Sequence, residues 1–415
     1  MNIAIIGSGI AGLTVAHLLS RQHHITLFEA DPRLGGHTHT VDVTVDGRSY
    51  AIDTGFIVYN DWTYPNFIHL LDQLGVASRP AEMSFSVCDP DNNLEYNGHN
   101  LNTLFAQRSN LLSPGFWGML RDILRFNRQA LLDLEEQRIP ADMTLGDYLR
   151  RNGYGRRFTE HYIVPMGSAI WSMSLAAMLE FPLQFFVRFC KNHGLLSVSD
   201  RPQWRVIEGG SRSYIEPLSA RFREGIRLNC PVQRVERDAE SVTLYSAAGR
   251  ERFDRVVFAC HSDQALALLA NPSATEREIL GALRYADNDV VLHTDTRLLP
   301  ARRLAWASWN YRLGGPADQP AAVTYNMNIL QGIDSDTTFC VSLNQTEAID
   351  PARILRRFRY AHPQYSLAGL AAQARWRELL GAQHTYYCGA YWANGFHEDG
   401  LVSALRVAAA FGEVL

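Results

Sequence analysis

The hydrophobic pattern divides the chain into segments with different secondary structure. Residues 2–6 and 23–30 are short runs rich in β-branched residues and predict strands, while residues 10–19 between them carry an apolar helical pattern. From about residue 100 to 200, apolar positions recur at helical spacing, as in 116–137. Residues 204–270 return to strand, Gly-Gly turn and helix, and residues 285–345 alternate as in an antiparallel sheet with one apolar and aromatic face.

The helical insertion at 100–200 contains one further start signal and one unusual stretch. Thr144 is placed as an N-cap, with Asp147 at the capping-box position. Between His161 and Arg188 the only charged side chain is Glu180. Because prolines interrupt this stretch, we interpret it as buried helices lining a cavity, and an element that dips into a membrane is the alternative.

The first strand and helix are joined by glycines. Gly7, Gly9 and Gly12 follow the spacing G-x-G-x-x-G, which a dinucleotide site needs for a tight turn, for close approach to a pyrophosphate and for helix–strand packing. The start of the helix then faces the phosphates. The second strand ends on Glu29, twenty-two residues after Gly7, where a carboxylate binds ribose hydroxyls. This combination predicts a dinucleotide cofactor, either NAD or FAD.

The segment after Glu29 favours FAD. It reads EADPRLGG, with Arg33, Gly35 and Gly36 directly after the ribose acid, and it resembles the E-A-x-x-R-x-G-G pattern of the FAD-dependent amine oxidase and phytoene desaturase superfamily. The resemblance implies Glu29 and Arg33 near the adenosine half of FAD, and Gly35 and Gly36 near its pyrophosphate. His37 stands where many amine oxidases have arginine. The segment 50–60 is similar to the one that passes beside the flavin ring.

The last segment, GFHEDGLVSA at 395–404, is similar to the superfamily pattern G-Y-x-E-G-A-x-x-S-G, in which a helix begins at the flavin's pyrimidine edge. The resemblance implies that N–H groups at 399–402 stabilise negative charge on the reduced flavin while the acids cap the helix. The cofactor-binding residues expected from all these segments are Gly7, Ser8, Gly9, Ile10, Ala11, Gly12, Glu29, Ala30, Arg33, Gly35, Gly36, His37, Thr54, Gly55, Phe56, Val232, Glu398, Asp399, Gly400 and Leu401.

The expected fold is α/β. It combines a Rossmann-like FAD-binding domain, made of residues 1–75, 203–270 and 380–415, with an amine-oxidase-like α+β substrate domain, made of residues 76–202 and 271–379. In the resemblance, a strand residue at the position of Val232 meets the adenine.

Composition excludes several classes of function. A net charge of −4 over 415 residues argues against a nucleic-acid partner. Six cysteines without close pairs indicate neither a metal site nor a disulfide framework, and the first residues contain no secretory signal, so we expect a cytoplasmic protein. Lys191 is the only lysine, which disfavours lysine chemistry and the lysine–water bridge to the flavin used by many amine oxidases.

No acid–base pair stands out, and no catalytic residue is assigned. Phe396 and Trp392 could form an aromatic wall, although for each aromatic residue a place in the core is the stronger interpretation. The candidates for the substrate cavity are Trp171, Trp309, Asn326, Trp392 and Phe396.

A closer resemblance spans nearly the whole chain in the motifs GGHTHTV, IDTGFIVYN, NHGLL, RPQW, EGGS and GFHEDG. These are similar to a bacterial FAD oxidoreductase family found beside cyclopropane-fatty-acid-synthase-like methyltransferases, and fused to them in plants. That association implies a methylated or cyclopropanated acyl chain as substrate, a tunnel lined by residues 160–190, and a methyltransferase partner. An oxidase of amines or small cyclic compounds and a non-catalytic flavin-bound partner are the alternatives. Arginines at 150, 151, 156 and 157 could contact lipid head groups at the inner membrane face, or form a solvated helix face.

Overall fold

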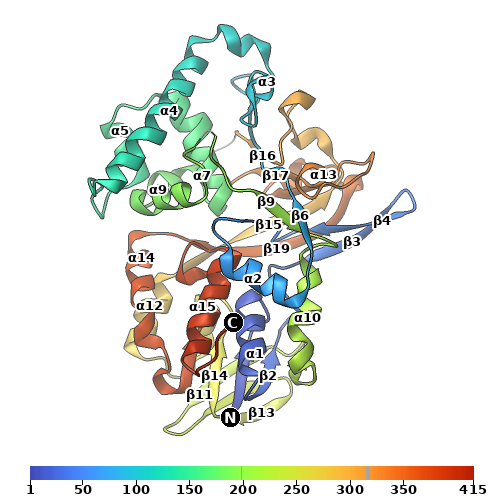
Figure 1. The fold of residues 1–415 in the computed structure, drawn as a ribbon, viewed down its shortest axis with the longest axis vertical. Coiled ribbons are helices and arrows are strands. Elements are labelled where there is room, and N and C mark those ends of the chain that lie inside the picture. The colour runs from blue at the N-terminus through green and yellow to red at the C-terminus, as the bar shows by residue number, and fades with distance from the viewer. Residues whose placement is uncertain (198, 315–317) are drawn as a thin grey trace.

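The computed structural model describes residues 1–197, 199–314 and 318–415. Two sheets form its framework, and helices cover them (Figure 1). The first sheet is parallel and has five strands in the order β10-β2-β1-β14-β20. Its strands are β10 (Ile226–Arg227), β2 (His24–Phe28), β1 (Asn2–Ile6), β14 (Arg255–Phe258) and β20 (Thr385–Tyr387).

The strands of this sheet come from three separated segments of the chain, and they are short and almost fully buried. Two helices cover one region of the sheet and lie side by side: α1 (Ile10–Leu19) and α15 (His397–Ala409) (Figure 1). Gly400 approaches Ile10 so closely that an added Cβ would lie 2.8 Å from its Cγ2 atom. The first turns of the two helices therefore meet, although one stands near each end of the chain.

The second sheet has seven strands in the order β19-β15-β18-β17-β16-β7-β8. All its pairs are antiparallel except β16 with β7. The strands are β19 (Ile354–Gln364), β15 (Arg284–His293), β18 (Cys340–Leu343), β17 (Val323–Asn326), β16 (Trp309–Arg312), β7 (Phe85–Asp89) and β8 (Leu94–Asn97). The sheet expected over 285–345 is thus present, and it also recruits strands from residues 85–97 and 354–364.

Three smaller sheets complete the fold. Strands β3 (Thr40–Val45) and β4 (Arg48–Asp53) form a hairpin. Strands β5 (Val58–Asn60), β9 (Trp204–Ile207) and β6 (Ser78–Pro80) form a second group. Strands β11 (Val232–Arg237), β12 (Val242–Ser246) and β13 (Gly249–Phe253) form a third.

The insertion at 100–200 is helical. Its elements are α3 (Leu101–Leu104), η1 (Arg108–Leu112), α4 (Pro114–Glu135), α5 (Leu145–Arg151), α6 (Arg156–Phe158), the π-helical turn η2 (Thr159–Ile163), α7 (Val164–Trp171), α8 (Leu175–Leu179) and α9 (Leu183–Asn192). The N-cap expected at Thr144 is confirmed, because its Oγ1 accepts the N–H of Asp147 at 3.1 Å. Across the described residues, none of the helices combines the length and the apolar character that crossing a bilayer would require.

The main cores follow the two sheets, and some of the packing crosses the expected division of the chain. Helices α12 (Ala274–Ala282) and α14 (Leu367–Ala374) belong by sequence to the expected substrate domain. Their buried residues Ile279 and Ala372 instead join the core beside the parallel sheet, together with Val256 and Phe258. Their apolar faces therefore cover the cofactor domain.

Candidate cofactor and substrate site

The glycine turn after β1 leaves the tip of α1 open. Gly7 has a φ of +101°, and a Cβ on Gly12 would lie 2.0 Å from the carbonyl oxygen of Gly7, so both positions require glycine. Gly9 is the N-cap of α1, and an added Cβ there would meet nothing within 4 Å. No side chain caps α1, and its first turn, which begins with Ile10 and Ala11, carries no acid. The positive end of α1 thus has space beside it for a phosphate.

The acid at the end of β2 is tied to this turn. Glu29 accepts the N–H of Ser8 at 2.9 Å and the Ser8 hydroxyl at 2.5 Å. The N–H of Cys230 donates to the carbonyl oxygen of Glu29 at 2.8 Å, which brings the start of β11 at Val232 to the same edge. Ala30 is exposed beside it. The structure therefore gathers the residues expected around the ribose and adenine.

The second glycine pair lies against the first. The N–H of Gly35 donates to the carbonyl oxygen of Ser8 at 3.0 Å, and a Cβ on Gly36 would come within 3.2 Å of the Cα of Gly9. The side chain of Arg33 is engaged within its own loop. Its guanidinium donates to the carbonyl oxygens of Gly36 at 2.8 Å and Thr38 at 3.2 Å. It braces the loop instead of reaching toward Glu29.

The loop continues beside the segment expected near the flavin ring. The N–H of Phe56 donates to the carbonyl oxygen of His37 at 2.7 Å. A Cβ on Gly55 would lie 2.2 Å from that same oxygen, so the close pairing depends on glycine. The hydroxyl of Thr54 lies 2.9 Å from that of Tyr360 on β19. Phe56 stacks on His397, the first residue of α15, with ring centroids 3.6 Å apart. Segments from the N-terminal and C-terminal parts of the chain are therefore in contact here.

Histidines line this region in their neutral form. Burial, the largest cause, lowers the pKa of His37 to about 4, and those of His362 and His397 to about 3. The rings of His37 and His362 lie 5.6 Å apart, and His397 shares a hydrogen bond of 2.8 Å with the hydroxyl of Tyr214. The Nε2 atom of His37 is buried without a hydrogen-bond partner. This nitrogen is therefore available to a polar ligand.

The two acids of the last segment cap two different helices. Asp399 accepts the N–H groups of Asn394 at 3.1 Å and Phe396 at 2.9 Å, at the start of α15. Glu398 instead accepts the N–H groups of Asn66 at 3.0 Å and Phe67 at 2.8 Å. Those two residues begin α2 (Pro65–Leu74), so Glu398 ties α2 to α15. Burial raises the pKa of both acids, to about 6 for Asp399.

The expected N–H groups at 399–402 are shifted by two residues. Helix α15 begins at His397. The N–H groups of residues 397–399 therefore have no carbonyl partner in a preceding turn of the helix. The N–H of Gly400 already donates to the carbonyl oxygen of Phe396 at 3.1 Å, and the side chain of Leu401 is fully buried in the core. The tip of α15 still presents its positive end beside the tip of α1.

These features fit an FAD molecule. The open space at Gly9, with the uncapped tip of α1 behind it, suits a pyrophosphate. The partnerless Nε2 atom of His37 and the tip of α15 supply polar groups farther along the same loop. Because the N–H groups at the tip of α15 are complementary to negative charge on a flavin, the residues present match the cofactor that the sequence predicts.

A cavity of about 400 Å³ adjoins the tips of α15 and α2. Its size falls within the range of small-molecule sites. Phe396 lines it and stacks on Phe189 with ring centroids 5.0 Å apart. His193 also stacks on Phe189, at 3.9 Å. The lining residues are Trp62, Thr63, Tyr64, Pro65, Asn192, His193, Asn394, Phe396, Glu398 and Asp399.

Among the five expected substrate residues, Phe396 lines this cavity and Trp171 lies behind it. The indole N–H of Trp171 donates to the carbonyl oxygen of Asn394 at 3.4 Å. Trp309 packs edge-on against Tyr325 at 4.9 Å within the seven-stranded sheet. Asn326 uses its side-chain oxygen to cap the short helix α13 (Met327–Leu330). Neither Trp309 nor Asn326 lines the cavity.

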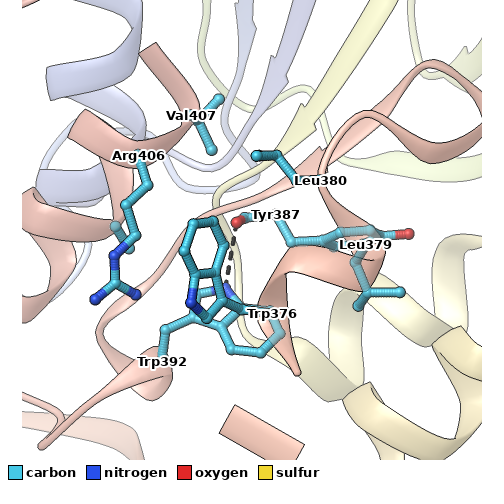
Figure 2. A pocket seen from close by; sticks show the side chains of 8 residues that line it. Trp376, Leu379, Leu380, Tyr387, Trp392, Arg406 and Val407 are labelled. Carbon is cyan, nitrogen blue, oxygen red and sulfur yellow. Dashed lines mark hydrogen bonds between the residues drawn. The ribbon is translucent and has the colours of Figure 1, made fainter. Parts of the chain in front are cut away.

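Trp392 lies elsewhere. Figure 2 shows its indole beside Trp376 and Arg406, with the indole N–H donating to the carbonyl oxygen of Tyr387 at 3.2 Å. The cavity in this view has a volume of about 10 Å³, too small for more than one water molecule. The expected wall of Trp392 and Phe396 is therefore not formed, because Trp392 turns into the core beside the parallel sheet.

Segment 160–190 contributes nothing to the 400 Å³ cavity. Its apolar residues pack together as a closed aromatic core in which, for example, Trp171 and Phe181 lie 4.5 Å apart. The tunnel expected along residues 160–190 is therefore not formed by these side chains, because they bury one another. Lys191 pairs with Glu135 at 2.8 Å on the surface.

The arginine cluster of the insertion is largely engaged by its own neighbours. Arg150 pairs with Asp147 at 2.6 Å and Arg156 with Glu160 at 2.8 Å. Arg157 donates to Ser113 at 3.1 Å. These bonds favour the interpretation as a solvated helix face.

Asp53 was missed by sequence reasoning. Its buried carboxylate accepts the hydroxyl of Thr40 at 2.6 Å, the N–H of Ser211 at 2.9 Å and the amide of Gln331 at 3.0 Å. Burial is the largest cause of its pKa rising to about 6. The motifs IDTG and EGGS signalled that both segments mattered, but the contacts with Ser211 and Gln331, 158 and 278 residues away, could not be assigned without the fold.

Comparison with known proteins places these features in a family. A model of the family described as flavin containing amine oxidoreductase matches residues 10–303. A Mycobacterium tuberculosis protein named "Putative flavin-containing monoamine oxidase AofH" is 23% identical over 285 residues, which cover 66% of this chain and 59% of that protein.

Solved structures share the fold over 99% of this chain and 98% of their own. Cyclohexylamine oxidase from Brevibacterium oxydans superimposes with a TM-score of 0.67 at 16% identity. A CLA-producing fatty acid isomerase from P. acnes superimposes with a TM-score of 0.69 at 15% identity. At these identities the likeness concerns the fold.

Proposed function

Because the chain belongs to the family of flavin-containing amine oxidoreductases and FAD is its cofactor, we propose that it is an oxidoreductase that removes a hydride from a carbon atom of an apolar substrate. FAD, when bound, supplies the hydride acceptor. The tip of α1 and Gly9 would hold the pyrophosphate, and the tip of α15 would stabilise negative charge on the bound cofactor. The neutral histidines add no positive charge.

The observation that supports an apolar substrate is the hydrogen bonding of the two acids in the 400 Å³ cavity. Asp399 and Glu398 are already bound to N–H groups of the two helix tips. These bonds leave few lone pairs on either carboxylate for an ammonium group. The ring of Phe396 and the stacked rings behind it add an apolar surface to a lining that also contains Thr63, Asn192 and Asn394.

We further propose a fatty acyl chain, methylated or cyclopropanated, as the substrate. Support comes from the motif resemblance to the family associated with lipid methyltransferases, and from the fold shared with a fatty acid isomerase. The position of the only lysine adds to it. Lys191 lies at the surface with Glu135, so no lysine is available for the water bridge typical of amine oxidases. A methyltransferase partner remains an expectation from the same resemblance.

The test is anaerobic mixing of the FAD-loaded protein with methyl-branched, cyclopropane-bearing and straight acyl lipids, and with a panel of amines. We expect the absorbance of oxidised flavin to fall with acyl lipids alone. Phe396→Ala should slow this reduction, whereas Phe396→Tyr, which keeps the ring, should retain it. Reduction by amines, with none by acyl lipids, would overturn the choice of substrate.

Oxidation of an amine is the second candidate. The relatives named as monoamine and cyclohexylamine oxidases favour it, and Phe396 stands where the family pattern carries an aromatic residue before the last helix. Hydrogen peroxide released in air with a cyclic amine, and lost in Phe396→Ala, would support this candidate.

A further inference from the structure

The end of the molecule farthest from the N-terminus carries projecting apolar side chains. It is formed by α3, η1 and the start of α4 (Figure 1). Leu112 is 88% exposed and Leu101 is 77% exposed. Trp117, half exposed, donates its indole N–H to the carbonyl oxygen of Leu111 at 2.9 Å. This bond holds the turn in place, so the leucines point outward from a fixed backbone.

One face of α4 continues this apolar surface. Trp117, Leu124 and Leu132 are exposed and follow one another at spacings of seven and eight residues, which places them on the same side of the helix. Arg121 and Arg128 lie between them at positions four residues after Trp117 and Leu124, and both are exposed. We name Leu101, Leu112 and these five residues the apical surface.

The apical surface has an excess of positive charge. Residues 101–128 contain four arginines and one acid, Asp122. Asp122 is buried, and it accepts the N–H of Gly155 at 2.9 Å on the inner side of α4. The side chain of Arg121 is 80% exposed and lies 3.8 Å from the Asp122 carboxylate. Exposed Glu135 and Glu136 lie beyond Leu132, so the part of the surface between residues 101 and 128 is the part complementary to negative charge.

We propose that the apical surface binds the face of an anionic lipid bilayer, with Leu101, Leu112 and Trp117 entering the interface and Arg121 and Arg128 contacting lipid phosphates. A projecting tip with separate leucines suits insertion between head groups, whereas a stable protein partner needs a broad complementary face of about 1,000 Å². Arginines near such a membrane each add favourable energy. The proposal does not depend on the identity of the substrate.

The test measures co-sedimentation of the FAD-loaded protein with vesicles of phosphatidylcholine alone and of phosphatidylcholine with phosphatidylglycerol. We expect binding to the anionic vesicles that weakens as salt is added. Removal of one leucine that inserts into the bilayer should reduce the affinity for vesicles about tenfold, so Leu112→Ser tests insertion. The pair Arg121→Gln and Arg128→Gln should reduce affinity about thirtyfold on anionic vesicles only.

Leu367→Ser is the matched control, because Leu367 is 39% exposed on α14, in the body of the molecule. It should bind vesicles as the wild type does. Every variant should keep its bound FAD and its Tm, which separates loss of binding from loss of folding or of the cofactor site.

Two results would overturn the proposal. One is equal binding to neutral and anionic vesicles by wild type and all variants. The other is a protein that ignores vesicles but self-associates in gel filtration and becomes monomeric in Leu112→Ser, which would identify the surface as an interface between copies of this chain.

Discussion

Replacement of Gly9 by alanine should separate cofactor binding from folding. Gly9 has a φ of −64° and a ψ of 178°, which alanine adopts readily, and an added Cβ meets nothing within 4 Å. The unfolding free energy of the apoprotein should therefore change by less than about 0.5 kcal/mol. The new methyl group enters the space assigned to the pyrophosphate, and overpacking of this kind costs about 1–3 kcal/mol. The Kd for FAD should rise about 5- to 150-fold.

Two other glycines provide controls for this experiment. Gly118→Ala adds a methyl group on α4, where nothing lies within 4 Å, and should leave the Kd for FAD unchanged. Gly12→Ala should damage folding itself, because its Cβ would lie 2.0 Å from the carbonyl oxygen of Gly7. Calorimetric titration of the apoprotein with FAD and unfolding in urea measure the two effects. Wild-type affinity in Gly9→Ala, or an apoprotein as unstable as Gly12→Ala, would refute the reasoning.

Three further variants test the remaining parts of the site. Burial lowers the pKa of His397 to about 3, below its unfolded pKa of about 6.5. The contribution of neutral His397 to folding stability is therefore complete above about pH 6.5 and is lost as the pH falls toward 3. His397→Gln should reduce the loss of stability on acidification, measured by unfolding in urea, by about 1.4 kcal/mol per pH unit between about pH 6 and 4. Glu398→Ala should cost about 1–2 kcal/mol of stability at pH 7, because the N–H groups at the start of α2 lose their acceptor, and hydrogen exchange should rise in α2 first; unchanged exchange there would contradict the capping role. Lys191→Ala should leave the rate of flavin reduction unchanged, since Lys191 pairs only with Glu135 at the surface, and a large fall in that rate would contradict its peripheral place.

The cofactor half of the fold could be predicted because its signals are local. The glycines at 7, 9 and 12, the acid at 29 and the pair at 35 and 36 each impose a backbone requirement that sequence spacing reveals. The structure brings these segments together. The last helix could be placed beside them only through resemblance to a known family, because no local pattern says where a C-terminal helix packs.

The incorrect predictions concern residues whose positions are determined by contacts with distant parts of the chain. Trp392 and Phe396 are four residues apart, yet the turn between them sends one into the core and the other into the cavity. The apolar stretch at 160–190 has the composition of either a lined tunnel or a closed core, and only the mutual packing of its rings distinguishes the two. Glu398 resembles a local cap, but its partners lie more than three hundred residues earlier.

The central claim is that the tips of α1 and α15 hold one FAD molecule between them. The most direct measurement is the flavin content of the protein after reconstitution with FAD and gel filtration, from its absorption spectrum. The account predicts one FAD for each chain, retained through the column. A colourless protein, with all the flavin eluting free, would contradict it.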